Sequence, residues 1–323
     1  MPVTTIETIR ANLHNCLDDT SSLNLPNGKK GKVRDTYDLG DSLVLITTDR
    51  QSAFDRILAS VPFKGQVLNQ VSEFWFEQTK DIVRNHVLEV PDPNVTIGMK
   101  CQVLPIEFVV RGYLTGSTST SAWTQYNRGL RDICGNKLPD GMVKNQKLEH
   151  PILTPTTKSE EHDESISAEE IVAQGLIEES LWKKLEEIVF ALFARGQRIA
   201  ARNGLILVDT KYELGIDRER NVVLVDEIHT PDSSRYWIAE SYEKRFTEGL
   251  EPESIDKEFL RLWFKEHCDP YNDPELPPAP DDLVVEVSLR YIQLYERITG
   301  RQFEVDTTTP IQERLEKNLA KLK

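Results

Sequence analysis

Two short apolar runs that each end in carboxylates constrain the fold of this chain more than any other feature. The first run, LILVDTKYE, covers residues 205–213, and the second, VVLVDE, covers residues 222–227. Both runs begin with aliphatic residues, many of them β-branched, and the polar, turn-like residues 215–221 lie between them. This pattern predicts a β-hairpin.

One face of the predicted hairpin carries a concentration of charge. Side chains alternate along a strand, so Asp209, Lys211 and Glu213 lie on the same face. Closing the hairpin brings Asp226 near them. Three carboxylates around one lysine, beside apolar strands, are costly to bury unless a cation lies among them. Oxygen ligands on a rigid sheet suit Mg²⁺, which usually binds together with substrate phosphates. The alternative is a solvated hairpin tip with ordinary surface charges.

The overall charge limits the kinds of partner that this chain can bind. Acidic residues outnumber basic residues by 53 to 39, a net charge of −14. We therefore expect no general binding to nucleic acids or membrane surfaces, and an anionic substrate needs a local cluster of Lys and Arg. No run of about 18 apolar residues is present, so no transmembrane helix is expected. The four cysteines are scattered without a CxxC pair, which is typical of a reduced, cytoplasmic protein.

Strand-like segments come first in the chain and helix-like segments later, which favours an α+β fold of two lobes. Residues 32–37, 43–47 and 101–111 are predicted strands, and residues 74–85 are a predicted helix. Residues 130–164 are rich in Pro, Gly, Asn and Lys. We expect them to form either a long surface excursion or a substrate loop.

The second half of the chain contains clear helix signals. Ser167 and Glu170 have the spacing of a capping box. An apolar stripe over residues 181–193 predicts a helix that faces the core, and Gly204 suits its C-terminal end. Pro310 then opens a final segment that has apolar residues at helical spacing. These residues are Ile311, Leu315, Leu319 and Leu322.

Several separate segments have the composition of anion-binding sites. Residues 28–35, GKKGKVRD, join flexible backbone to four positive charges, although no Walker A sequence is present. A hairpin lid over a nucleotide or an exposed basic turn are both compatible with this segment. Arg111 ends an apolar strand just before Gly116 and Ser117, and arginine can bind phosphate or carboxylate through two donors. Further segments of this kind are TPTTK at 154–158, TPDSSR at 230–235, and Lys244 with Arg245. Together they indicate an ATP-dependent enzyme whose second substrate is also anionic.

The order of these motifs resembles the SAICAR synthetase family. The six motifs are GKVRD at 31–35, DRQSAFD at 49–55, VVRGY at 109–113, TPTTK at 154–158, DTKYE at 209–213, and DE at 226–227 with TPDSSR at 230–235. The resemblance covers roughly residues 25–300. Residues 116–123 and the C-terminal region are most similar to the longer, plant-like form of the family.

The resemblance implies an ATP-dependent ligase of de novo purine synthesis. Such an enzyme joins the carboxylate of carboxyaminoimidazole ribonucleotide (CAIR) to the amine of L-aspartate, and yields SAICAR, ADP and phosphate by way of an acyl phosphate. The implied fold is a kinase-like or ATP-grasp-like pair of lobes with antiparallel sheets, and the active site lies between the lobes. The expected division is a nucleotide-binding lobe at 1–104, a larger lobe at 105–303 and a helical tail at 304–323.

The resemblance also implies a role for individual residues. For ATP these residues are Gly31, Lys32, Val103 and Lys211; for CAIR they are Arg111, Ser117, Arg235 and Arg245. For Mg²⁺ they are Glu213 and Asp226, with Asp209 as second choice; for catalysis they are Lys211, Lys158 and Thr157. Lys29 and Lys30, which precede Gly31, are further candidates for the contact with phosphate.

Two other functions stay open at this point. A small-molecule kinase on a related scaffold would release a stable phosphorylated product. A nucleotide-binding regulatory protein without turnover would have no use for Lys211, Glu213 and Asp226. The tail beyond residue 304 has no implied role, and its apolar stripe is expected to pack on the body or to mediate self-association.

Overall fold

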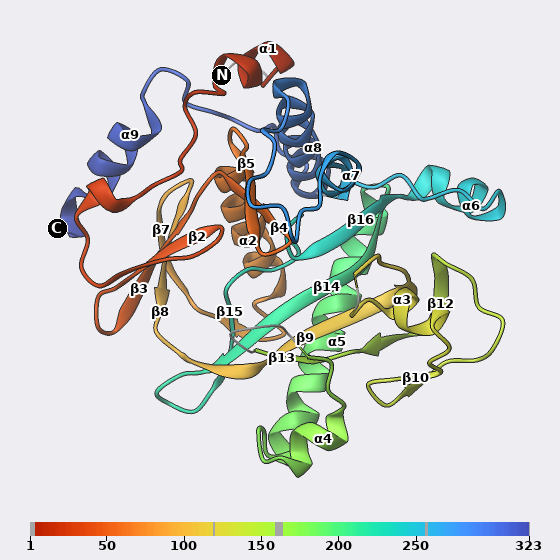
Figure 1. Cartoon of the computed structure of the whole chain (residues 1–323). Coiled ribbons are helices and arrows are strands. Elements are labelled where there is room, and N and C mark those ends of the chain that lie inside the picture. The colour runs from red at the N-terminus through yellow and green to blue at the C-terminus, as the bar shows by residue number, and fades with distance from the viewer. Residues whose placement is uncertain (1–3, 119, 159–163, 256–257, 323) are drawn as a thin grey trace.

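The protein has a mixed α+β fold with two main sheets, as the sequence predicts (Figure 1). The computed structural model describes residues 4–118, 120–158, 164–255 and 258–322. Ser119, within the 116–123 stretch, and residues 159–163 of the 130–164 segment lie outside this part of the chain. The first sheet has the strand order β1-β2-β3-β8-β7. Its strands are β1 (Gly28–Lys30), β2 (Arg34–Asp38), β3 (Ser42–Thr47), β7 (Val87–Asp92) and β8 (Val95–Met99).

The second sheet contains the predicted acidic hairpin and has the order β12-β9-β14-β15-β6. In addition, β13 pairs with β9 and β16 pairs with β14. The strands are β6 (Arg84–Asn85), β9 (Gln102–Leu114), β12 (Gln146–Leu153), β13 (Thr156–Thr157), β14 (Leu205–Ile216), β15 (Val222–Val225) and β16 (Ser234–Ile238). Two small hairpins are β4 (Arg50–Ala53) with β5 (Arg56–Ser60), and β10 (Asp132–Ile133) with β11 (Asn136–Lys137). Glu213 is opposite Val225, so the hairpin prediction is confirmed.

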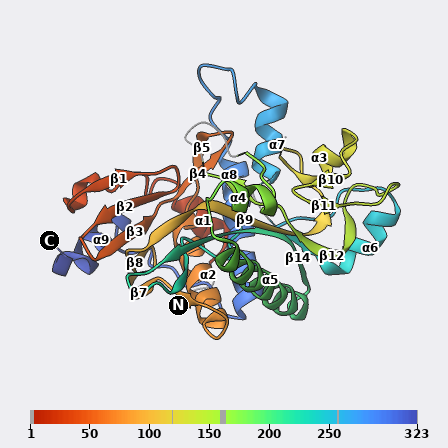
Figure 2. The ribbon, with the colours of Figure 1, turned by 90° about the horizontal axis from the view of Figure 1, so that it is seen from below.

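Helices cover the sheets and fix their relative positions. The longest, α5, lies along one face of the second sheet (Figure 2) and buries the predicted apolar stripe there. Its neighbour α4 begins at a complete capping box between Ser167 and Glu170, as predicted. The helices are α1 (Ile6–Ala11), α2 (Lys64–Thr79), α3 (Ala122–Asn127), α4 (Ala168–Ala173), α5 (Glu179–Arg202), α6 (Ala239–Thr247), α7 (Glu258–His267), α8 (Asp281–Thr299) and α9 (Ile311–Asn318). Short 3₁₀ turns lie at Ser21–Leu23 and Ala320–Leu322. No described helix has the length and apolarity needed to span a membrane.

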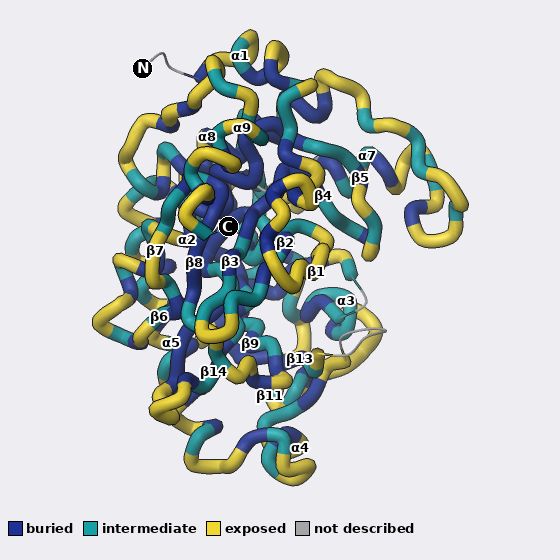
Figure 3. The backbone as a smooth tube through the Cα atoms, turned by 90° about the vertical axis from the view of Figure 1, so that its left-hand side faces the viewer, coloured by how far each residue is buried: buried dark blue, intermediate teal, exposed yellow. Residues whose placement is uncertain are grey.

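Two local predictions are wrong. The helix predicted at 74–85 is α2, which begins at Lys64 and ends at Thr79. Its first half, residues 64–72, is buried on almost every side, so it shows no amphipathic pattern that would mark it as a helix (Figure 3). Residues 130–164 were predicted to form a loop, but they contain β12, which pairs with β9. Pairing with a neighbouring strand stabilises this polar segment, and its own sequence does not reveal that partner.

The C-terminal tail packs on the first sheet. Leu315 of α9 and Leu319, which caps the C-terminal end of this helix, are fully buried in an apolar cluster with residues of the N-terminal region and of β3 and β8. Next to this cluster, Arg314 binds the buried Asp92 through Nε at 3.0 Å and Nη2 at 3.1 Å. The alternative of packing on the body is therefore observed. The division of the chain at residues 104 and 303 stays a prediction.

We expect Leu315→Ala to lower the thermal unfolding temperature without changing kcat. Leu315 is fully buried, and truncation of a buried leucine to alanine costs about 2–5 kcal/mol. The exposed Lys317 lies on the same helix, so Lys317→Ala is the matched control. Thermal melting and steady-state kinetics are measured on the three proteins. Equal melting of Leu315→Ala and the wild type would contradict the packing role of the tail.

Candidate functional site

The face of β14 predicted to carry the site does hold a network of opposite charges. Lys211 Nζ lies 2.6 Å from Glu107 Oε1 of β9 and 3.3 Å from Glu213 Oε1. Burial alone disfavours the charged amine, but the carboxylates of Glu213 and Glu107 raise the pKa of Lys211. The lysine is therefore a fixed positive charge at neutral pH.

The other end of the same strand face binds arginines. Asp209 is opposite both Arg111 of β9 and Arg235 of β16, and its Oδ2 accepts from the two guanidinium groups at 3.3 Å and 2.5 Å. Arg111 Nε also donates to Thr154 Oγ1 at 2.8 Å, so a residue of the TPTTK motif helps to orient it. The strand therefore places an arginine-rich end and a lysine–glutamate end on one surface.

Asp226 links the two sheets through a residue from the basic loop region. Arg34 of β2 lies 2.5 Å from Asp226 Oδ1 and 2.8 Å from Glu227 Oε2. Burial disfavours the charged guanidinium, but these two carboxylates raise the pKa of Arg34. Asp226 also has a positive φ of 65°, a conformation uncommon for aspartate, so the backbone turns sharply where its carboxylate meets Arg34.

Lys158 lies on the same side of the sheet as Glu213, whereas the Thr157 side chain alternates to the other side. Thr157 belongs to β13, opposite Ile106 of β9, and the Lys158 amide donates to the Pro105 carbonyl at 3.2 Å. The Lys158 amine forms a short ion pair with Glu213 Oε2. Glu213 therefore contacts both lysines that the sequence predicts to be catalytic.

Arg50 stabilises the basic loop at the tip of the β1–β2 hairpin through hydrogen bonds to its backbone. This buried arginine pairs with Asp35 at 2.5 Å and donates to the carbonyls of Gly31 at 3.0 Å and Lys32 at 3.3 Å. A Cβ at Gly31 would lie 2.3 Å from the Arg34 carbonyl oxygen, so the tight turn requires glycine. The side chain of Lys32 is on the surface and pairs with Asp55 at 2.5 Å.

Residues of the DRQSAFD motif support the site through contacts with backbone groups. Asp49 is fully buried and accepts the Gly65 amide in the first turn of α2 at 2.8 Å, which satisfies an amide that has no partner within the helix. Val103, the predicted adenine contact, lies near the start of β9 opposite Gly215, and 45% of its surface is exposed. It follows directly after the segment that joins the first sheet to the second.

A cavity of about 430 Å³, called the Arg235 pocket below, opens at the arginine-rich end of β14. Its lining residues are Thr115, Gly116, Ser117, Lys144, Arg235, Trp237, Glu251, Pro252, Ser254, Leu262 and Arg290. The pocket thus brings Ser117 and Arg235 together, as predicted. Arg111 lies beside it through the shared contact with Asp209. Arg245 of α6 is not part of the lining, although its Nε donates to the backbone carbonyl of the lining residue Glu251 at 2.6 Å.

Three charged residues of the site received no role from the sequence. Glu107 lies within an apolar strand and shows no motif of its own, while Arg290 belongs to an amphipathic helix far along the chain. Arg34 stands inside the quoted GKVRD motif, and its position next to the basic loop was the available signal. Glu107 and Arg34 bind partners that are distant in sequence, and Arg290 lines a pocket whose other residues come from distant segments, so no local pattern identifies these roles.

Glu213 of β14 is opposite Val225, the last residue of β15, and Asp226 follows Val225 directly; both side chains offer carboxylate oxygens, which is the chemistry that Mg²⁺ requires. Within the described residues, however, no three His, Cys, Asp or Glu side chains converge as a ready set of metal ligands. Both carboxylates instead bind lysine or arginine side chains. A dication at this position would therefore need further oxygen ligands from a bound phosphate.

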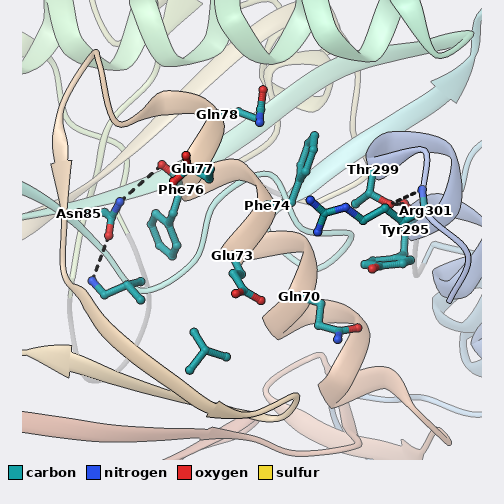
Figure 4. Close-up of a pocket in the computed structure, with 12 residues that line it drawn as sticks. Gln70, Glu73, Phe74, Phe76, Glu77, Gln78, Asn85, Tyr295, Thr299 and Arg301 are labelled. Atoms are coloured by element: carbon teal, nitrogen blue, oxygen red, sulfur yellow. Dashed lines mark hydrogen bonds between the residues drawn. The ribbon is translucent and has the colours of Figure 1, made fainter. Parts of the chain in front are cut away.

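A second cavity of about 440 Å³ lies between α2, β7 and the end of α8 (Figure 4). Glu73 and Glu77 of α2 line it together with Arg301 and several amide side chains. Burial raises the pKa of Glu73. No residue that the sequence predicts for substrate binding lines this cavity, and two carboxylates against one arginine are a poor match for a polyanionic substrate.

Comparisons with known proteins agree with these motifs. The SAICAR synthetase family profile matches residues 27–277. A phosphoribosylaminoimidazole-succinocarboxamide synthase of Legionella pneumophila (strain Paris) is 60% identical over 307 residues, which cover 94% of this chain and 97% of that relative. The chloroplastic enzyme of that name from Arabidopsis thaliana is 57% identical over 316 residues, 96% of this chain and 77% of the relative. The similarity to a plant form is thereby confirmed.

Solved structures give the same result for the fold. SAICAR synthase from Saccharomyces cerevisiae, complexed with SAICAR, superposes with a TM-score of 0.76 at 33% identity, over 89% of this chain and 98% of that chain. A SAICAR synthetase in complex with ADP superposes with a TM-score of 0.66 at 26% identity, over 86% and 100%. By sequence and by fold, the chain belongs to the SAICAR synthetase family.

Proposed function

We propose that this chain is an ATP-dependent ligase that joins the carboxylate of CAIR to the amine of L-aspartate, and releases SAICAR, ADP and phosphate in purine biosynthesis. The observation that carries the proposal is the division of one strand face of β14. Its Asp209 end binds two arginines, and its Glu213 end binds two lysines. Such a surface fits a substrate with two anionic groups, one of which reacts with ATP.

The chemistry requires activation, because the oxygen of a carboxylate is a poor leaving group. In the first step a carboxylate oxygen of CAIR attacks the γ-phosphorus of ATP, the bond to the β-phosphate oxygen breaks and ADP leaves. In the second step the amine of L-aspartate attacks the acyl carbon, the bond to phosphate breaks, and the new amide nitrogen loses a proton. The protein contributes positioning and neutralisation of charge, as in other phosphoryl transfers.

Lys211 and Lys158 are the residues that we assign to charge neutralisation at the reacting end. Both contact Glu213, and both are amines that can turn toward phosphate oxygens when a nucleotide binds. Thr157, which precedes Lys158 in the TPTTK motif, is the least supported of the three, because the neighbouring Thr156 shares the face of Glu107 and Glu213. We assign these residues to the neighbourhood of the reacting carboxylate and of L-aspartate.

Glu213 and Asp226 are the proposed ligands of Mg²⁺, since one or two carboxylates plus substrate phosphates are its usual environment. When bound, Mg²⁺ neutralises charge on the transferring phosphate. Asp209 is the second choice as a ligand, but its contacts with Arg111 and Arg235 favour a role in orienting these arginines.

For ATP we propose the basic loop and the start of β9. Backbone amides near Gly31 and the amine of Lys32 are suited to phosphate, and Val103 offers backbone groups to adenine. For CAIR we propose Arg111, Ser117 and Arg235, which line or adjoin the Arg235 pocket. Arg245 is the least supported of the predicted residues for CAIR, because it lies outside that lining.

Release of ADP distinguishes this ligase from a kinase that acts on CAIR. The ligase needs an amine to capture the acyl phosphate, so we expect sustained ADP release only with ATP, Mg²⁺, CAIR and L-aspartate together. The product carries a new amide, and free phosphate equals ADP. Succinate has the same two carboxylates without the amine, so it should bind weakly and never be consumed.

Turnover without L-aspartate that yields a stable phosphorylated product would instead support the kinase. Failure of CAIR and ATP to react under any condition would support a regulatory protein. Homo-oligomer formation and a cytoplasmic location stay predictions; the second depends on the scattered cysteines, which are all free thiols.

A further inference from the structure

The Arg235 pocket has a charged residue on its wall that none of the six motifs contains. Arg290 of α8 lines the pocket together with Ser117 and Arg235. We infer that Arg290 binds the 5′-phosphate of the nucleotide substrate. This inference depends on the proposed function, because that function supplies the substrate.

The position of the pocket along β14 indicates which part of the substrate it receives. The reacting carboxylate has to lie near Lys211 and Glu213, where ATP is activated. Asp209, which binds Arg235 of the pocket, is four residues from Glu213, about 13 Å at the usual rise of a strand. The pocket therefore receives the end of the nucleotide that is remote from the reacting carboxylate, and that end carries the phosphate.

Arg290 is held in place by its own helix. Its Nε lies 2.7 Å from Glu286 Oε1, one turn earlier on α8, and 29% of its side chain is exposed. A guanidinium that is already oriented loses less conformational freedom when it binds a phosphate. The planar group also suits two parallel hydrogen bonds to phosphate oxygens.

The helix that carries Arg290 is fixed relative to Arg235. The next residue, Tyr291, donates its hydroxyl to Asp232 Oδ1 at 2.6 Å, and Asp232 lies three residues before Arg235. The fully buried Lys64 of α2 binds the other oxygen of Asp232 at 2.8 Å. Two residues before Arg290, Ser288 donates its hydroxyl to the Pro62 carbonyl at 2.7 Å. These contacts hold the two arginines of the pocket in a constant relation.

The competing explanation is an ordinary ion pair between Arg290 and Glu286 on a helix surface. Such pairs contribute little to stability, and they have no reason to lie in the wall of a substrate pocket. The sequence predicted a third basic residue for this substrate at Arg245, which does not line the pocket. Arg290 does line it, and adds a second arginine to the pocket beside Arg235 of β16.

The test compares CAIR with the corresponding nucleoside, which lacks the 5′-phosphate, by titration calorimetry. We expect Arg290→Ala to weaken CAIR binding roughly 10- to 100-fold, the effect of removing hydrogen bonds to a charged group. Binding of the nucleoside and of ATP should stay as in the wild type. Arg290→Lys should recover part of the loss, because it keeps the charge. Arg297→Ala is the matched control on the same helix, since Arg297 is exposed and outside the pocket.

Unchanged CAIR affinity in Arg290→Ala, with normal binding by the wild type, would overturn the role of Arg290 alone. An equal loss for CAIR and the nucleoside would also overturn it, because the arginine would then contact another part of the substrate. A wild-type protein that binds no CAIR would overturn the ligase function as well. Thermal melting accompanies each titration, and the lysine variant decides the question if the alanine variant is unfolded.

Discussion

We expect Glu213→Gln and Asp226→Asn each to lower kcat by on the order of 10²-fold or more, with the protein still folded. Each substitution keeps the shape of the side chain and removes one negative charge. If these carboxylates hold Mg²⁺ on the transferring phosphate, the loss falls on the chemical step. Steady-state kinetics at saturating substrates measure kcat, and titration with MgCl₂ measures the concentration required for half-maximal activity, which should rise.

Glu219→Gln is the control for this pair. Glu219 lies exposed in the turn of the same hairpin, so the substitution removes the same charge without touching the site. It should leave kcat and the MgCl₂ requirement unchanged. Near-normal turnover in both Glu213→Gln and Asp226→Asn would refute the metal assignment.

The second large effect is expected at Arg235. We predict that Arg235→Ala weakens CAIR binding by about 2–5 kcal/mol, the usual cost of removing one member of a desolvated charge pair. Asp209 then loses its 2.5 Å partner and keeps only Arg111 at 3.3 Å, so one carboxylate in the site becomes poorly compensated. Calorimetry with CAIR and with ATP should show that the loss is specific to CAIR.

Arg128→Ala controls for the general loss of a positive charge. Arg128 is exposed at the end of α3 and outside the Arg235 pocket, so this variant should bind both ligands normally. A result in which Arg235→Ala weakens ATP and leaves CAIR unchanged would move Arg235 to the nucleotide site. Equal weakening of both ligands would indicate a general disturbance of the sheet.

The acidic hairpin is an example of a feature that residues close together in the sequence were enough to predict. Alternation along one strand was enough to place Asp209, Lys211 and Glu213 on a common face, and the observed contact between Lys211 and Glu213 agrees with it. The capping box at Ser167 and the stripe of α5 were equally accessible, because each depends on residues a few positions apart. The same reasoning failed for α2, whose first half is too uniformly buried to show a periodic pattern.

The sequence contained less information on residues whose roles depend on contacts with distant parts of the chain. A tail without an implied role proved to complete the core of the first sheet through Leu315 and Leu319. Arg245 is a basic residue near the TPDSSR motif, as expected of an anion site, yet its guanidinium contacts the backbone carbonyl of Glu251 and Arg245 does not line the pocket. Proximity in sequence therefore overestimated Arg245 and gave no indication of Arg290.

The sequence by itself determined the hairpin, the charge pattern along β14 and the ordered motifs of the family, since these depend on strand alternation and on chemistry within short segments. Only the tertiary structure decided which charges meet. The pairing of Arg34 with Asp226 spans 192 residues, and the position of Arg290 depends on how α8 packs against α2 and on the bond from Tyr291 to Asp232. Such contacts result from the packing of whole elements around a common core, and no short segment contains the information that specifies them.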